Sequence, residues 1–258
     1  MSFKKRLLLG EDLFGYSVGL SDPCISEMTG MVGFDFLWID TEHSAMDYQC
    51  LLMHIIAAHS AGTASLVRIP WNEPYLAKRV LEMGPDGIIF PMIKSAGEAK
   101  AAMDACLYPS MGKRGFGPRR ACKYELEPLD EYIQDMPNRL SRLVQVEHVD
   151  AVNDFDNILK VPYIDGFIIG PCDLAASIGR INELTCDENL AMIDSVVAKC
   201  RDAGKAIGIC IGDTSREAAA FWRARGINFI TVGHDLGAIV NDARNAIANL
   251  RQAYGTGE

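Results

Sequence analysis

Short apolar runs alternate with longer mixed segments along most of the chain. The runs are rich in β-branched and aromatic residues, and several, such as residues 87–93, are apolar without alternation. Unbroken runs are typical of parallel strands that helices cover on one face and packed side chains on the other. The predicted strands are residues 15–20, 34–40, 65–70, 87–93, 143–147, 166–169, 206–211 and 229–232.

The segments between these runs carry apolar residues at helical spacing. The helices that this spacing predicts are residues 47–61, 73–83, 95–106, 187–203, 215–225 and 235–254, with an amphipathic first helix within residues 1–10. Residues 108–132 break the regularity and predict a long loop. Eight strands separated by helices, in a chain of 258 residues, favour a single (β/α)8 TIM barrel that forms one domain over residues 1–258.

Charge and composition exclude several kinds of partner. The formal net charge of −9 would repel a phosphate backbone, so we expect no nucleic acid partner. The basic start of the chain is followed by an apolar stretch that Glu11 and Asp12 interrupt, and no apolar run approaches the roughly 18 residues of a membrane span. We therefore expect a cytoplasmic protein with no membrane partner.

Polar side chains collect where the predicted strands end. The carboxyl ends of barrel strands form the face on which catalytic groups lie, so residues far apart in sequence would meet there. Carboxylates, an arginine and histidines at one rim indicate a site for a metal and an anion. The residues concerned are Asp40, Glu42, His43, Arg68, Glu147, His148, Asp173, His234 and Asp235.

Glu147 and Asp173 are the candidate metal ligands. Glu147 follows the apolar run 143–146, and a carboxylate buried there needs a partner that offsets its desolvation. A hard divalent cation is such a partner, and Asp173 from the neighbouring strand would supply a second oxygen ligand. The alternative is that Asp173 caps the short helical turn 174–177.

Arg68 and His43 are the candidates for anion binding and proton transfer. A guanidinium at the end of a strand could clamp a carboxylate in bidentate fashion, although an ion pair with Asp40 or Glu42 is the alternative. An imidazole can both accept and donate a proton, which makes His43 the candidate for proton transfer. Asp40 could orient the His43 ring.

These residues lie in motifs that resemble one known family. The chain resembles the class II pyruvate aldolases of the HpcH/HpaI group, which includes the 4-hydroxy-2-oxoheptanedioate and 2-keto-3-deoxy sugar-acid aldolases. The motifs that carry the resemblance are residues 33–43, 67–74, 108–117, 145–147 and 166–174.

The resemblance implies a role for each candidate. Glu147 and Asp173 would hold Mg2+ or Mn2+, with Co2+ as an alternative, and Arg68 would position pyruvate and stabilise its enolate. His43 with Asp40 would transfer the proton.

Further implications concern the surroundings of the site and the assembly. Pro171 and Cys172 would contact the substrate, and Glu82 stands where many relatives have an aspartate in the active-site network. The resemblance also implies a homohexamer, a dimer of trimers, in which residues 114–124 approach a neighbouring active site.

The reaction implied is the metal-dependent cleavage or formation of a 4-hydroxy-2-oxo acid from pyruvate and an aldehyde, through a metal-stabilised pyruvate enolate. Two alternatives use the same enolate: oxaloacetate decarboxylation and chemistry like that of macrophomate synthase. A third, of another class, is a binding barrel without turnover. The motifs concern the pyruvate end of the substrate and leave the aldehyde open.

Overall fold

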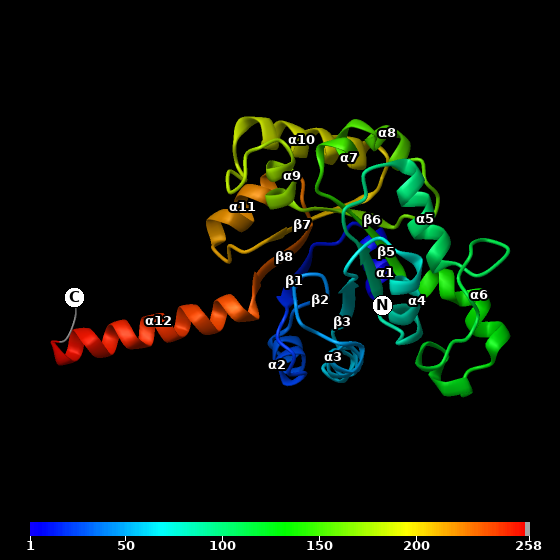
Figure 1. The fold of residues 1–258 in the computed structure, drawn as a ribbon, viewed down its shortest axis with the longest axis horizontal. Helices are drawn as coiled ribbons and strands as arrows, with labels where there is room; N and C mark the ends of the chain where they lie inside the picture. Colours follow the sequence, from blue (N-terminus) through cyan, green and yellow to red (C-terminus); the bar gives the residue numbers. More distant parts are fainter. Residues whose placement is uncertain (256–258) are drawn as a thin grey trace.

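The computed structural model describes residues 1–255, which form a closed barrel of eight parallel strands (Figure 1). Each strand pairs with the next along the chain, and β8 returns to pair with β1. The predicted (β/α)8 barrel is thus confirmed. The strands are β1 (Leu13–Val18), β2 (Phe36–Asp40), β3 (Ala64–Arg68), β4 (Gly87–Phe90), β5 (Ser141–Val146), β6 (Gly166–Ile169), β7 (Ala206–Ile211) and β8 (Phe229–His234).

Helices connect the strands and surround most of the barrel. The α-helices are α1 (Phe3–Leu8), α2 (Cys24–Val32), α3 (Tyr48–Ser60), α4 (Pro74–Glu82), α5 (Ala96–Cys106), α6 (Leu129–Arg139), α7 (Val149–Asn153), α8 (Phe155–Ile158), α9 (Pro171–Ser177), α10 (Asp187–Asp202), α11 (Arg216–Ala224) and α12 (Asp235–Tyr254). The spacing missed α2, whose glycine, serine and threonine residues favour helix only weakly.

The predicted loop over residues 108–132 was partly wrong. It contains the 3-10 turn η1 (Arg120–Glu125), in which Cys122 is buried, and the start of α6. η1 is short and polar, so no apolar period marks it in the sequence. In α6, by contrast, Leu129, Tyr132, Ile133 and Met136 stand at helical spacing, a signal that the prediction missed.

The barrel interior is filled by every second residue of the strands. Its apolar cluster takes side chains from seven strands, together with two from α1 at the amino end of the barrel. Its members are Phe3, Leu7, Leu13, Phe36, Trp38, Leu66, Ile89, Leu143, Ile168 and Phe229. The predicted first helix therefore closes one end of the barrel, and Lys4 anchors it through an ion pair of 3.0 Å with buried Asp165.

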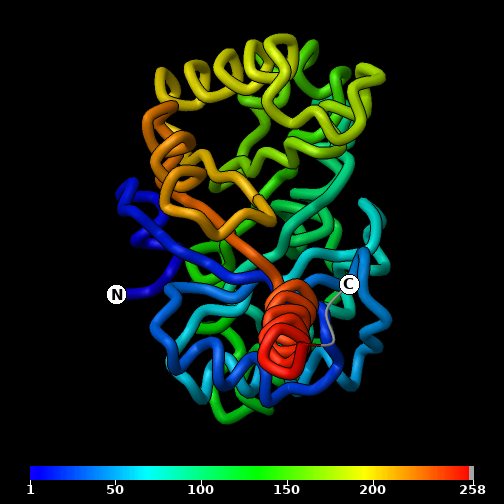
Figure 2. Tube along the Cα trace, turned by 90° about the vertical axis from the view of Figure 1, so that its left-hand side faces the viewer, coloured from blue at the N-terminus to red at the C-terminus, as the bar shows by residue number. Residues whose placement is uncertain are grey.

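The final helix, α12, departs from the pattern. It projects from the body of the molecule, as Figure 1 shows from the side and Figure 2 nearly end-on. All residues from 238 to 255 are exposed. Among the described residues, no helix has both the length and the apolar character needed to cross a membrane.

Stability should depend on the packed interior. Leu143→Ala removes a fully buried side chain from the interior cluster, and we expect a loss of about 2–5 kcal/mol in the free energy of unfolding. The control is Leu126→Ala, at a side chain that is 87% exposed, which should change stability by less than about 0.5 kcal/mol. Urea unfolding followed by circular dichroism measures both, and equal effects would contradict the packing argument.

Candidate active site

The inward alternation of the strands continues to the open, carboxyl end of the barrel and places polar side chains there. On β2 and β3 the inward positions end in Asp40 and Arg68, which are neighbours in the strand register. On β5 they continue from Leu143 to Gln145 and Glu147. The same periodicity that builds the apolar interior therefore also assembles the polar rim.

Arg68 is held by two carboxylates. Its Nε and Nη2 donate to Asp40 Oδ1 and Oδ2 at 3.0 and 2.6 Å, and its Nη1 lies 3.0 Å from Glu42 Oε2. The guanidinium carbon lies 5.2 Å from the centre of the Trp38 ring at the top of the interior cluster. The side chain is thus fixed in place, while its remaining N–H groups are available to another oxygen.

Glu147 is a buried carboxyl group. Only 2% of the residue is exposed, and its two oxygens accept hydrogen bonds from the Met92 backbone N–H, at 2.6 Å, and from Gln145 Nε2. Burial, reinforced by the charge of Glu42, raises the pKa of Glu147 to about 7. The desolvation cost of the ionised Glu147 carboxylate is therefore not fully offset by its surroundings, and a nearby cation would offset it.

Met92 shapes this environment through its backbone. Its φ of 51° lies in the left-handed region, which is uncommon for a residue with a side chain. This conformation accompanies the 2.6 Å hydrogen bond from its N–H to Glu147. Backbone strain of this kind often occurs at functional sites.

Asp173 approaches the same region from α9. The structure contradicts the alternative that it caps this helix: the N-cap is Gly170, without a side-chain cap. Within residues 1–255 its carboxylate makes no hydrogen bond or ion pair. Its charge nevertheless contributes to raising the pKa of both Glu147 and Glu42.

The residues present fit a divalent cation. Among the described residues, Asp40 and Glu42 pair with Arg68, whereas Glu147 and Asp173 form no ion pair, and Gln145 Oε1 is buried without a partner. In the described chain no three His, Cys, Asp or Glu side chains converge to hold an ion by themselves. A cation at Glu147 and Asp173 would therefore need water or substrate oxygens as well, as Mg2+ commonly does.

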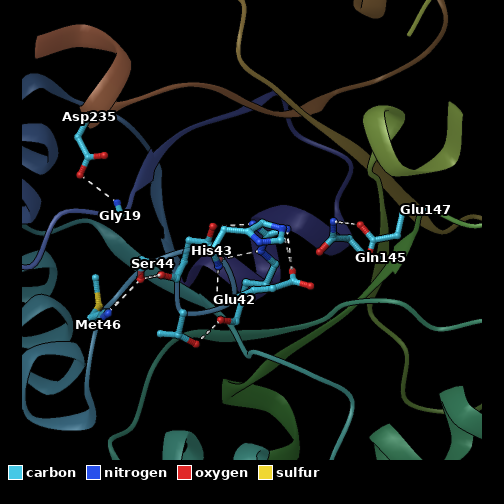
Figure 3. Close-up of polar contacts among 11 residues, drawn as sticks. Gly19, Glu42, His43, Ser44, Met46, Gln145, Glu147 and Asp235 are labelled. Carbon is cyan, nitrogen blue, oxygen red and sulfur yellow. Dashed lines mark hydrogen bonds and ion pairs between the residues drawn. The ribbon is translucent and has the colours of Figure 1, made fainter. Parts of the chain in front are cut away.

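The expected pairing of Asp40 with the His43 ring was wrong. Asp40 pairs with Arg68, and its contacts with the His43 segment are hydrogen bonds from the backbone N–H groups of Glu42 and His43, at 3.0 and 3.4 Å. The carboxylate beside the ring is Glu42, whose Oε2 lies 3.9 Å from His43 Nε2 (Figure 3). The His43 side chain is 65% exposed and so lies at the mouth of the site.

Glu82 lies away from the rim of its own barrel. Its expected place in the active-site network was therefore wrong as far as the site of the same chain is concerned. It is the last residue of α4, which runs from the rim towards the other end of the barrel. There its Oε1 lies 3.1 Å from Arg114 Nη2. A helix of nine residues rises about 13 Å, which is beyond contact with Arg68.

Pro171 and Cys172 begin α9, next to Asp173. Pro171 is buried, and its carbonyl accepts a hydrogen bond from Asn189. Cys172 is exposed at the rim, and partial burial of its thiol raises its pKa, which disfavours a thiolate nucleophile. Both residues are placed where they could line the site.

Two residues of the site were not among the predicted catalytic or metal-binding residues. Glu42 was named at the rim and as a possible partner of Arg68, without a catalytic or metal-binding role, and Gln145 was named only as part of a motif. Both stand two positions from a predicted residue, Asp40 and Glu147 respectively, and this spacing was the available signal. His148 and His234 at the rim are instead caps of α7 and α12.

Most of the chain is similar to one known protein family. The family model described as HpcH/HpaI aldolase/citrate lyase matches residues 14–242. The chain belongs to this family. Because the family and its named relatives are aldolases, the chain is an enzyme, a carbon–carbon lyase.

Individual relatives match nearly end to end. A hydroxypyruvate/pyruvate aldolase of Roseovarius nubinhibens is 33% identical over 97% of this chain and 96% of its own. A 4-hydroxy-2-oxo-heptane-1,7-dioate aldolase of Shigella sonnei is 34% identical over 91% and 88%. The crystal structure of a family member from Burkholderia cenocepacia superposes with a TM-score of 0.90 at 31% identity, over 96% of this chain and 98% of that one.

The packing around Glu147 gives a test of the candidate site. A Cβ at Gly170 would lie 2.6 Å from Glu147 Oε2, so Gly170→Ala should displace the carboxylate and weaken Mn2+ binding roughly 10- to 100-fold. The control is Gly212→Ala, which follows β7 as Gly170 follows β6 and whose Cβ would meet nothing within 4 Å. Mn2+ titration followed by electron paramagnetic resonance measures both affinities. Unchanged binding in Gly170→Ala would contradict the role of Glu147.

Proposed function

We propose that this lyase cleaves and forms the carbon–carbon bond between pyruvate and an aldehyde in a 4-hydroxy-2-oxo acid, with a divalent metal, Mg2+ or Mn2+, at Glu147 and Asp173. The observation that carries the proposal is the combination of a fixed guanidinium, Arg68, with the buried Glu147 and with Asp173, which has no partner within residues 1–255, at one rim. The named aldolases among its relatives support this choice.

In cleavage, several residues of the chain would each have a separate role. When bound, the metal would act as a Lewis acid towards the keto group of the substrate. Arg68 would direct its unused N–H groups at the oxygen on which enolate charge develops. Asp40 and Glu42 would keep the guanidinium in that position.

Proton transfer would take place at the mouth of the site, where the exposed His43 ring lies. A base removes the proton of the 4-hydroxyl, the C3–C4 bond breaks, the aldehyde leaves, and the bonding electrons form the pyruvate enolate, which takes a proton at C3. We assign the proton to His43, since its exposed ring can exchange protons with solvent. Glu42, 3.9 Å away, would stabilise the protonated ring.

We also propose that the chain assembles as a homohexamer, a dimer of trimers, with residues 114–124 at a neighbouring active site. Arg114 at the start of this segment is only 3% exposed, pairs with Glu82 and lies 4.6 Å above the Tyr108 ring. The segment is therefore anchored rather than free. In such an assembly, Glu82 would serve another subunit's site.

The reaction is tested by its products. Incubation with 4-hydroxy-2-oxo acids should release pyruvate and an aldehyde, EDTA should abolish turnover, and Mg2+ or Mn2+ should restore it. Glu147→Gln and Asp173→Asn should each weaken Mn2+ binding, which is measured without substrate. Carbon dioxide release from oxaloacetate with no aldehyde from any hydroxy-oxo acid would favour the decarboxylase alternative, and full activity in excess EDTA would exclude a required metal.

Arg68→Lys tests the role of the guanidinium. A lysine has a single ammonium group and cannot pair with Asp40 through two atoms while also facing Glu42. We expect kcat to fall about 100-fold, since stabilisation of the developing enolate is lost, along with a higher KM. Steady-state kinetics would show it, with Arg180→Lys, at an exposed arginine paired with Glu188, as the control. A change in KM alone would contradict enolate stabilisation.

A further inference from the structure

A groove with a basic lining runs between α4 and α5, which lie side by side on the outside of the barrel (Figure 1). Its volume is about 700 Å³. We call it the lysine groove. Its charged lining consists of Lys78 on α4, Lys100 and Asp104 on α5, and Lys113 and Arg114 in the segment that follows α5. None of these residues belongs to the polar rim of the candidate active site.

The charge of the lysine groove is opposite to that of the chain as a whole. The chain has a formal net charge of −9, yet the groove is lined by four cationic side chains and a single carboxylate. That carboxylate, Asp104, is already paired, because Lys100 Nζ lies 2.7 Å from its Oδ2. A concave surface with an excess of positive charge attracts anions.

Lys78 and Lys113 are the cations that the protein leaves uncompensated. Among residues 1–255, their ammonium groups make no hydrogen bond or ion pair. Arg114 is only 3% exposed and pairs with Glu82, but its Nε is buried without a partner in the same part of the chain. Two ammonium groups can therefore still donate to a ligand, and Arg114 adds to the positive charge around them.

The segment that carries Lys113 is fixed against α5 by its backbone. The N–H of Lys113 donates to the Asp104 carbonyl at 2.7 Å, and the N–H of Arg114 donates to the Leu107 carbonyl at 2.8 Å. Gly112 permits this approach, because a Cβ there would lie 2.5 Å from the Leu107 carbonyl oxygen. The groove is therefore formed before any ligand binds, which lowers the entropic cost of binding.

Gly115 brings the same segment against Lys78. A Cβ at Gly115 would lie 2.8 Å from Lys78 Nζ and 3.2 Å from its Cε, so a larger residue would displace the ammonium group. Lys78 on α4 and Lys113 on the neighbouring segment thus lie on the same side of the groove. Two uncompensated cations from different elements are brought together although no carboxylate of the chain holds either of them.

Size and net charge indicate a small anion as the occupant. A volume of about 700 Å³ lies within the range of small-molecule sites. A long polyanion such as a nucleic acid would extend beyond the groove and be repelled by the net charge of −9.

We propose that the lysine groove binds a small molecule that carries two or more phosphate groups. Lysine ammonium groups bind phosphate oxygens as point charges, and several can share one polyphosphate. Tyr75 and Gly97, in the first turns of α4 and α5, also line the groove, and the N-terminal end of a helix attracts anions. The Tyr75 ring, which is 67% exposed, offers an apolar surface to the organic part of such a ligand. The inference does not depend on the proposed reaction.

Lysine acetylation locates the site in the wild-type protein. The protein is treated with N-hydroxysuccinimide acetate, with and without inorganic pyrophosphate, at equal ionic strength set with NaCl. At ten times Kd, pyrophosphate should slow acetylation of Lys78 and Lys113 roughly 10-fold, because only the free groove reacts. Mass spectrometry measures each site, and Lys160, an exposed lysine outside the groove, should react at an unchanged rate. Unchanged rates at Lys78 and Lys113, or equal protection of Lys160, would overturn the inference.

Calorimetric titration with pyrophosphate, without added divalent metal, provides a second measurement. Lys78→Gln/Lys113→Gln removes both uncompensated cations and should weaken binding roughly 10-fold or more. Lys5→Gln/Lys160→Gln removes the same charge at exposed positions elsewhere and should leave the affinity unchanged. Circular dichroism should show both variants folded. A wild-type protein that does not bind pyrophosphate, or a groove variant with the wild-type affinity, would overturn the inference.

Discussion

Closure of the barrel is the constraint on which the remaining structure depends. Once β8 pairs with β1, every strand has one face inside and one outside, and its side chains must alternate between them. The interior tolerates its large rings only beside glycines. A Cβ at Gly208 would lie 2.2 Å from the Phe229 ring, and one at Gly15 equally close to the Phe36 ring. Packing inside the barrel and the polar rim above it follow from the same alternation.

The rim has more carboxylates than cationic side chains to pair with them, and this excess of negative charge determines which ligands it can bind. Arg68 compensates Asp40 and Glu42, but Glu147 is buried and Asp173 is unpaired within residues 1–255. Burial and the mutual repulsion of carboxylates raise the pKa of Glu147. A divalent cation bound at this rim would remove the repulsion and use the same carboxylates as ligands. These carboxylates therefore suit the divalent cation that we propose for this rim.

Asp235 connects this rim with the outer surface of the barrel. Its carboxylate holds the loop after β1 at the mouth of the site, and its backbone begins the helix that projects outwards.

The order of the strands, their number and the rim positions of Asp40, Arg68, Glu147 and Asp173 could all be predicted from the sequence, because hydrophobic periodicity and the direction of parallel strands determine them. The pairing of Asp40 with Arg68, the approach of Glu42 to His43 and the location of Glu82 were decided by the tertiary structure. These contacts depend on separations of a few ångströms between distant segments. The apolar spacing of α12 is likewise the same whether its own barrel or another covers it, so only the three-dimensional structure shows that its own barrel does not.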